Sequence, residues 1–345
     1  MASASQIRPF KLIEAFQQSG YEVAVVEGSG KERQQQIAKI KTHIKQGMYY
    51  DFVYSESSVM PTLLTEKHHF PTYPCLDFSF LSFCKKHHIP IGLFYRDIYW
   101  CYINKGKDWK QRIAKYFYQY DLFKYKQLLD VLFLPSLEML PYIPFKFNKE
   151  VQSLPAGALV SQLPEPKQNG KLKLLYIGGL GGYYHIAQLL KVVSELPFVA
   201  LTICCRKAEW EQMKAEYSSF LNNQITILHA SGDTIKELYA QADVFTLLLK
   251  PNDYLNFAVS YKLFEAIGYQ RPLLGYAGTW SGNFIMKNHI GITCYYSEES
   301  LKEALISLHE QPELIHSFKE NLKTISKENS WESRCLQIAN ALVKS

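Results

Sequence analysis

The chain has 345 residues, of which 47% are hydrophobic and 20% charged, with a formal net charge of +6. This length favours two domains, and the composition is that of a globular protein rather than a disordered one. No apolar run approaches the roughly 20 residues that cross a bilayer, and the opening MASASQIRPF lacks the apolar core of a signal peptide. Seven cysteines without a framework spacing and without a CxxC pair indicate reduced thiols in a cytoplasmic protein, and they argue against structural zinc.

Short apolar runs alternate with amphipathic segments in the first half of the chain. Runs of Val, Ile, Phe and Tyr that end in a polar residue or Pro are typical of strands buried in a parallel sheet. We predict strands over 21–26, 50–55, 89–95, 130–135 and 151–154. We predict helices over 6–18, 32–46, 75–87 and 108–128.

A polar segment over 160–171, with two Pro and a Gly, is the best linker candidate, and the alternation resumes after it. The strands expected there cover 172–177, 198–205, 225–228, 243–249, 271–276 and 291–296. The expected helices cover 184–195, 208–220, 232–241, 257–268, 299–309, 312–327 and 331–343. Two similar β/α halves predict an α/β protein with two doubly wound Rossmann-like domains that face a cleft. The first domain would cover 1–159 and the second 172–330. A C-terminal helix within 331–345 could cross back to the first domain.

The stretch YIGGLGG follows a predicted strand and precedes a predicted helix. Its four glycines, Gly178, Gly179, Gly181 and Gly182, would let the backbone approach a ligand, and amide groups at such a turn favour a phosphate. The alternative is a tight turn without a ligand.

Two further basic segments follow strands of the second half. Arg206 and Lys207 come directly after one strand, where a guanidinium suits a phosphate, although a solvated helix start is an equal alternative. Lys262 and Glu265 lie three residues apart in SYKLFEAIGYQRPLLG, on a helix that is otherwise apolar. The alternative for this pair is a surface ion pair, but a carboxylate among apolar residues needs a partner, and a vicinal diol is a suitable one.

In the first half, Arg96 and Asp97 end an apolar strand. Asp97 could act as or orient a general base and Arg96 could bind an anionic leaving group, or the two could form an internal pair. Glu56 and Ser58 follow another strand in the same way. Arg8, in the first turn of a helix, is unfavourable for the helix dipole and suggests an anion nearby.

The segment 100–127 is rich in Lys, Arg and aromatic residues. This composition suits the surface of an anionic membrane, and it also suits stacking on single-stranded nucleic acid. A packed helix with a solvated lysine face is the third interpretation.

The order of these features resembles the GT-B glycosyltransferases, in particular the large retaining group used in capsule, O-antigen and exopolysaccharide synthesis. The resemblance covers nearly the whole chain and is strongest over 171–275. In that family the helix Glu holds the ribose hydroxyls of the donor nucleotide, which implies this role for Glu265. The family's glycine loop falls on 178–182, its diphosphate-facing cation on Arg206 or Lys207, and its N-domain pair on Arg96 and Asp97.

The resemblance implies a metal-independent hexosyltransferase without a cofactor, whose substrate is a nucleotide-sugar with UDP as the expected nucleotide. The acceptor would be a glycan or a polyprenyl-linked glycan, and Lys262 would lie near the diphosphate. We expect a cytoplasmic protein that contacts the inner face of the plasma membrane through 100–127 and binds no nucleic acid.

Three departures from the family pattern bear on function. Phe257 stands where many members have a second Glu that contacts the donor sugar, Arg96 replaces a His, and no strand precedes the first helix. The Phe257 and missing-strand departures favour, as the main alternative, a catalytically silent GT-B subunit that supports a partner transferase. A nucleic-acid-binding protein and a nucleotide-sugar epimerase of the same fold also stay open.

Overall fold

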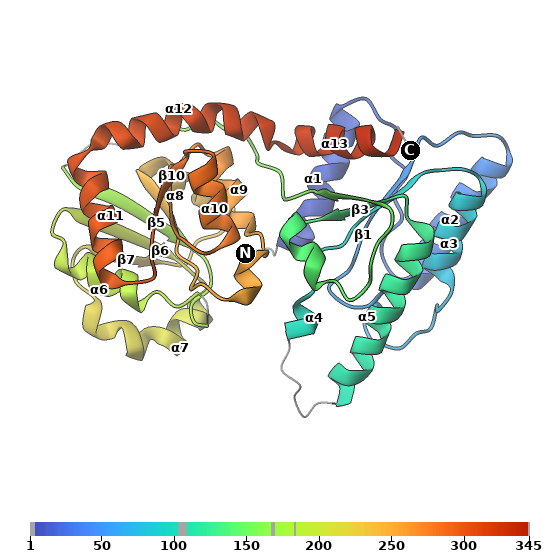
Figure 1. Ribbon diagram of the computed structural model, residues 1–345, viewed down its shortest axis with the longest axis horizontal. Helices are drawn as coiled ribbons and strands as arrows, with labels where there is room; N and C mark the ends of the chain where they lie inside the picture. Colours follow the sequence, from blue (N-terminus) through green and yellow to red (C-terminus); the bar gives the residue numbers. More distant parts are fainter. Residues whose placement is uncertain (1–3, 103–108, 167–169, 183, 344–345) are drawn as a thin grey trace. The chain divides into compact units, whose positions relative to one another are not determined.

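Figure 1 shows the protein as a computed structural model, which describes residues 4–102, 109–166, 170–182 and 184–343. The chain divides into two compact units. We call Ser5–Pro155 with Arg334–Ser345 the N-terminal unit, and Ala156–Ser333 the C-terminal unit. The last helix, α13 (Trp331–Val343), therefore begins in the C-terminal unit and continues as part of the N-terminal one.

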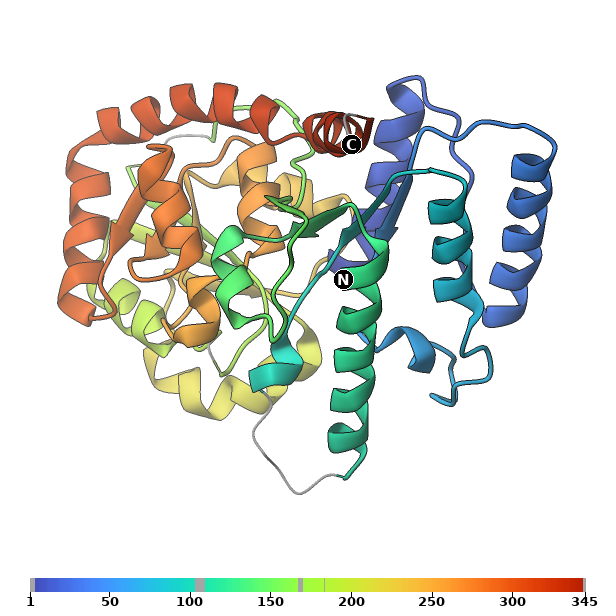
Figure 2. The ribbon, with the colours of Figure 1, turned by 45° about the vertical axis from the view of Figure 1, so that its right-hand side comes forward.

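The N-terminal unit contains a parallel sheet with the spatial order β1-β2-β3-β4. Its strands are β1 (Val53–Glu56), β2 (Ile91–Phe94), β3 (Val131–Leu134) and β4 (Glu150–Ser153). Its other helices are α1 (Ala4–Gln18), α2 (Gly30–Lys45), α3 (Leu76–Lys86), α4 (Tyr99–Tyr102) and α5 (Trp109–Leu128). The apolar runs of β2 and β3 are buried along their whole length, and α3 packs between α2 and α5 (Figure 2).

The strand expected over 21–26 is wrong. These residues form no ladder, and β1 is the edge strand of the described sheet. Tyr21 still packs on Phe16 and Phe52, but Val25 is exposed. The apolar alternation of this segment is typical of a strand, but alternation alone cannot supply the neighbouring backbone that a strand requires.

The C-terminal unit contains a parallel sheet of six strands in the order β10-β9-β8-β5-β6-β7. The strands are β5 (Leu172–Ile177), β6 (Val199–Cys204), β7 (Ile225–Leu228), β8 (Val244–Leu247), β9 (Leu273–Tyr276) and β10 (Gly291–Cys294). The helices are α6 (Ala187–Glu195), α7 (Lys207–Tyr217), α8 (Thr234–Gln241), α9 (Tyr261–Gly268), α10 (Trp280–Lys287), α11 (Glu298–Glu310) and α12 (Pro312–Glu328). Because β5 pairs with both β6 and β8, the strand order reverses there, which confirms the predicted doubly wound sheet.

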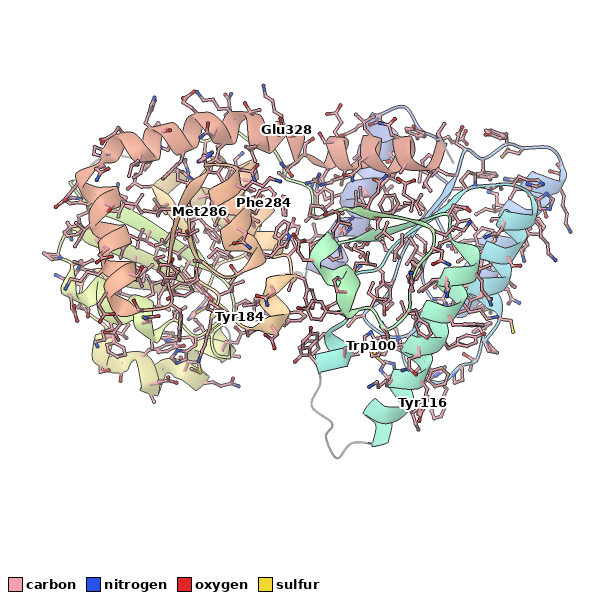
Figure 3. All side chains as sticks on the ribbon, in the orientation of Figure 1. Trp100, Tyr116, Tyr184, Phe284, Met286 and Glu328 are labelled. Atoms are coloured by element: carbon pink, nitrogen blue, oxygen red, sulfur yellow. The ribbon has the colours of Figure 1, made fainter. Side chains whose placement is uncertain are left out.

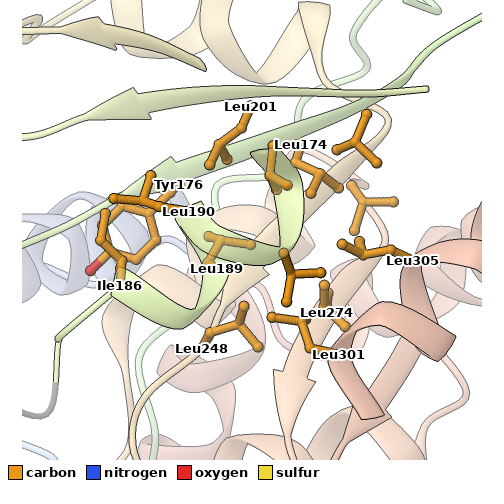
Figure 4. Packing of buried hydrophobic residues seen from close by; sticks show 14 of the residues in the cluster. Leu174, Tyr176, Ile186, Leu189, Leu190, Leu201, Leu248, Leu274, Leu301 and Leu305 are labelled. Atoms are coloured by element: carbon orange, nitrogen blue, oxygen red, sulfur yellow. The ribbon is translucent and has the colours of Figure 1, made fainter. Parts of the chain in front are cut away.

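Helices cover both faces of this sheet, which is why its strands are mostly apolar (Figure 1). One buried cluster joins strand residues to α6 and α11, and it includes Leu189, Leu190, Leu301 and Leu305 (Figure 4). A second buried cluster joins the strands to α8, α9 and α12. Each buried leucine contributes about 1.5–3 kcal/mol, so this sheet is a rigid base for the loops that follow its strands.

Two helices of the C-terminal unit differ from expectation. The helix predicted over 257–268 begins only at Tyr261, because Asn252 caps a separate 3₁₀ turn over Asp253–Asn256. The helix α10 was not predicted, since its Gly282 lowers helix propensity. That glycine is required, because a Cβ there would lie 2.1 Å from the carbonyl oxygen of Tyr276.

Candidate functional site

Glu265 lies in the middle of α9 with its hydrogen bonds gathered on one oxygen. The hydroxyl of Tyr239 donates to Oε2 at 3.1 Å, and Nζ of Lys262 donates to the same oxygen at 2.5 Å. Among the described residues, none donates a hydrogen bond to Oε1. The side chain is 20% exposed, so the carboxylate is only partly buried.

Tyrosines surround this carboxylate. Burial, together with the charge of Glu265, raises the pKa of Tyr261 to about 12 and raises that of Tyr269 above its ordinary value. Burial and the same carboxylate raise the pKa of Tyr239 well above its ordinary value. All three phenols therefore remain protonated near neutral pH, and Glu265 is a carboxylate held in an aromatic environment.

Two other residues of the SYKLFEAIGYQRPLLG stretch have structural roles. A Cβ at Gly268 would lie 2.6 Å from the carbonyl oxygen of Leu159, and the amide of Ser161 donates to the Gly268 carbonyl. The buried guanidinium of Arg271 donates from Nε to the Tyr239 carbonyl at 2.7 Å and from Nη2 to the Pro164 carbonyl at 2.8 Å. The glycine and the Arg-Pro pair thus attach the segment after Pro155 to this unit.

The glycine loop after β5 has the geometry of an open turn. Gly181 and Gly182 have φ values of +99° and +58°, and a Cβ at Gly182 would meet nothing within 4 Å. Among the described residues, the amides of Gly179 and Gly182 donate no hydrogen bond, whereas Gly181 forms an isolated antiparallel bridge with Tyr184. Gly178 differs, because its amide donates to the carbonyl of Cys204. The loop therefore presents unpaired amide donors at Gly179 and Gly182, as an anion site requires.

Glu209 on α7 connects this loop to Arg206. Its Oε2 accepts from the amide of Leu180 at 3.3 Å, and its Oε1 accepts from Nη1 of Arg206 at 3.0 Å. Arg206 and Lys207 are both exposed at the start of α7. Glu209 was not predicted as part of the site, although an acidic residue in a first helical turn is a common feature that could have indicated it.

In the N-terminal unit, Arg96 is held against β1. Its Nη2 donates to Oε2 of Glu56 at 3.1 Å, and its Nε donates to the Ser57 carbonyl at 3.3 Å. Burial lowers the pKa of Arg96, and the charge of Glu56 opposes that shift. Asp97 accepts the amide of Tyr99 at 2.8 Å, at the start of α4. Arg96 therefore pairs with Glu56 rather than forming the internal Arg96–Asp97 pair that was the alternative.

Glu56 also provides the anion expected near Arg8. Its Oε1 accepts from Nε of Arg8 at 2.7 Å and from the Tyr54 hydroxyl at 2.9 Å, and the Arg8 guanidinium lies 3.8 Å from the ring centre of Phe94. Ser58, which follows the same strand, is exposed, and its hydroxyl accepts from the amide of Met60. Glu56 thus joins α1, β1 and the end of β2.

The segment 100–127 extends across α4 and α5, although residues 103–108 lie outside the described part. On α5 the exposed apolar side chains follow a helical spacing: Ile113, Tyr116, Tyr120 and Phe123. Tyr116 is 74% exposed (Figure 3). Lys115 and Lys126 are exposed on the same helix, while Leu122 and Tyr125 on its other side are buried. We call the four exposed apolar residues the α5 stripe.

Two features are absent from the part of the chain that the structure describes. None of the described helices is long and apolar enough to span a bilayer. The same residues contain no group of three or more His, Cys, Asp and Glu side chains that could hold a metal ion.

Comparison at the level of sequence finds no match, because no family model and no curated protein matches this chain. Comparison at the level of structure finds many. Sucrose-phosphate synthase from Thermosynechococcus elongatus is 13% identical with a TM-score of 0.63, over 98% of this chain and 92% of that one.

Two more solved structures are similar to this chain over its whole length. Anabaena HepE in complex with UDP-glucose is 10% identical with a TM-score of 0.62, over 100% of this chain and 97% of that one. WaaG, a glycosyltransferase involved in lipopolysaccharide biosynthesis, is 15% identical with a TM-score of 0.60, over 100% of this chain and 97% of that one. These likenesses confirm the expected resemblance at the level of fold: the chain has the fold of the GT-B glycosyltransferases.

Proposed function

We propose that the protein is a glycosyltransferase that moves a hexose-type sugar from a UDP-linked donor to a glycan or polyprenyl-linked acceptor in surface polysaccharide synthesis. The observation that carries this proposal is the unpaired Oε1 of Glu265, fixed beside a doubly wound sheet. A carboxylate oxygen presented in this way suits a ribose hydroxyl. HepE, which shares the fold, is described in complex with UDP-glucose, which supports UDP as the nucleotide.

The C-terminal unit, whose expected domain covers 172–330, would bind the donor. The glycine loop, with its unpaired amides at Gly179 and Gly182, suits the diphosphate, and Arg206 and Lys207 would be nearby cations. Lys262 is paired with Glu265, so its ammonium group would bind the diphosphate while it still donates a hydrogen bond to the Glu265 carboxylate. Replacing Arg206 by Ala should weaken UDP more than uridine, because uridine has no diphosphate. Equal weakening of both ligands would contradict this assignment.

The N-terminal unit, whose expected domain covers 1–159, would bind the acceptor. Arg96 would then assist the departure of the diphosphate, and Asp97 would orient or deprotonate the acceptor hydroxyl. The fixed position of Arg96 on Glu56 supports a role for a guanidinium that does not need to reorganise. In this proposal the protein's own donors replace a metal, so activity should persist in the presence of a chelator. Complete loss of activity, restored by a divalent cation, would contradict metal independence.

The α5 stripe supports contact with the inner face of the plasma membrane. Its apolar side chains would enter the interface, while Lys115 and Lys126 would meet anionic headgroups. Cosedimentation should be stronger with phosphatidylglycerol vesicles than with phosphatidylcholine vesicles. Changing both Tyr116 and Phe123 to Ser should abolish it, whereas Tyr49→Ser should not, although Tyr49 is also exposed. Equal binding by all three proteins would refute the assignment.

The direct test is release of UDP from UDP-sugars in the presence of a lipid extract, with Glu265→Ala as the control. Turnover by the wild type and its loss in the variant are the expected results.

A second candidate is the catalytically silent subunit, which the buried Phe257 favours. This side chain packs edge-on against Tyr254, at the position where the family has a sugar-contacting Glu. UDP binding without turnover across a broad panel of donors would favour the silent subunit over the transferase.

A further inference from the structure

We propose that Tyr239 is a positioning residue of the nucleotide site, which holds the Glu265 carboxylate so that Oε1 is presented to the ribose hydroxyls. This inference depends on the nucleotide-binding role proposed above. Its geometric basis is that Tyr239 and Lys262 both donate to Oε2, at 3.1 and 2.5 Å, and that neither donates to Oε1. The two donors come from different helices, so together they fix the direction of the carboxylate.

Tyr239 is itself rigidly held, as a positioning residue must be. The side chain is fully buried, and its ring lies 4.6 Å from that of Tyr269 and 5.3 Å from that of Phe245. Its carbonyl accepts the Arg271 guanidinium at 2.7 Å. A buried ring has few alternative rotamers, so the hydroxyl is a fixed donor that does not need to be ordered when a ligand binds.

Lys262 alone would hold the carboxylate less well. Its ammonium group lies on a flexible chain and is 26% exposed, whereas the phenol is rigid and neutral. A hydrogen bond to a charged acceptor is also stronger and more directional than one between neutral groups. Loss of the phenol should therefore let the carboxylate rotate about its terminal torsion, which is soft.

The experiment combines a protein change with a ligand change. Tyr239→Phe removes one hydroxyl and keeps the ring, and 2′,3′-dideoxyuridine diphosphate removes the ribose hydroxyls and keeps the base and diphosphate. Calorimetry measures the affinity of each ligand for each protein. Tyr269→Phe is the matched control, because Tyr269 lies near Glu265 but, in the described structure, its hydroxyl donates no hydrogen bond to that carboxylate.

We expect Tyr239→Phe to weaken UDP about tenfold, as for a hydrogen bond to a charged group, and to weaken the dideoxy ligand by less than about twofold. Tyr269→Phe should leave both affinities within about twofold. A partly unfolded variant would lower the competent fraction equally for both ligands, so the ratio of the two affinities still measures the effect.

Equal weakening of both ligands by Tyr239→Phe would overturn the inference, because it would show a packing role. An unchanged UDP affinity would overturn it as well. If the wild-type protein bound neither ligand, the proposed nucleotide site would fail and this inference would fail with it. That outcome differs from the first two because it appears before any substitution is made.

Discussion

Glu56 in the N-terminal unit and Glu265 in the C-terminal unit each accept hydrogen bonds from a tyrosine and a cation, yet they differ in one respect. Both oxygens of Glu56 are used, by Arg8 and Tyr54 on one side and by Arg96 on the other. Glu265 has two donors on Oε2 and none among the described residues on Oε1. The exposed fraction of the side chain is 9% for Glu56 and 20% for Glu265.

This difference separates a structural carboxylate from a candidate binding carboxylate. A saturated acceptor between two guanidiniums has no capacity left for a ligand, so its removal should affect stability. An anchored acceptor with one open oxygen should cost less to lose in the free protein than a carboxylate between two guanidiniums, but it should be needed for binding. Substitutions at these and comparable side chains can test the distinction, beginning with the largest expected effect on stability.

Glu56→Ala should lower the free energy of unfolding by about 3–5 kcal/mol, because it leaves Arg8 buried without its carboxylate. Denaturant unfolding measures this change. Glu14→Ala is the control, since Glu14 pairs with Lys11 at an exposed position and its loss should cost less than about 1 kcal/mol. Similar losses in the two variants would show that Glu56 is not the structural centre of this unit.

Asp121 tests the role of exposure, because it is a carboxylate with an unpaired oxygen that is buried. Its Oδ2 accepts the amide of Thr62 at 2.6 Å, and Oδ1 has no partner among the described residues. Burial raises the pKa of Asp121 to about 6. The folded protein therefore binds this proton more tightly than the unfolded chain does, so the contribution of Asp121 to stability should fall as the pH rises from about 4 to about 6.

The loss over that pH range should be about 2–3 kcal/mol, and Asp121→Asn should remove it. Unfolding measured at several pH values gives the slope for both proteins. The same slope in the variant would mean that another group is responsible. Other carboxylates act in the opposite direction and can make the wild-type stability rise over this range. In that case Asp121→Asn should make the rise steeper.

Arg206→Ala should have the smallest effect on stability, less than about 0.5 kcal/mol, because its pair with Glu209 is exposed on the arginine side. Thermal unfolding checks this value. A large loss would show that Arg206 holds the glycine loop in place through Glu209, and it would weaken the assignment of this residue to the diphosphate.

Much of the fold was predictable, because apolar runs of the right length mark buried parallel strands wherever a neighbouring strand exists. The predicted bounds of β5 and β7 match the structure. Residues 21–26 have the same pattern but no neighbour, and α10 contains a glycine that only the nearby Tyr276 carbonyl explains.

The candidate site was predictable only in part. Lys262 and Glu265 are three residues apart, so their contact follows from helix geometry. Tyr239 lies 26 residues before Glu265, and Glu209 lies 29 residues after Leu180. Contacts of this range arise from the packing of α7, α8 and α9, and no local pattern in one sequence indicates them.

The central claim is most directly tested by UDP binding to the wild type and to Glu265→Ala, with unfolding measured in parallel. We predict that the wild type binds UDP and that the variant binds it at least about 30-fold more weakly, while its free energy of unfolding falls by about 1–3 kcal/mol because the buried Tyr239 hydroxyl loses its acceptor. A variant that binds UDP as tightly as the wild type would contradict the assignment of Glu265 to the nucleotide.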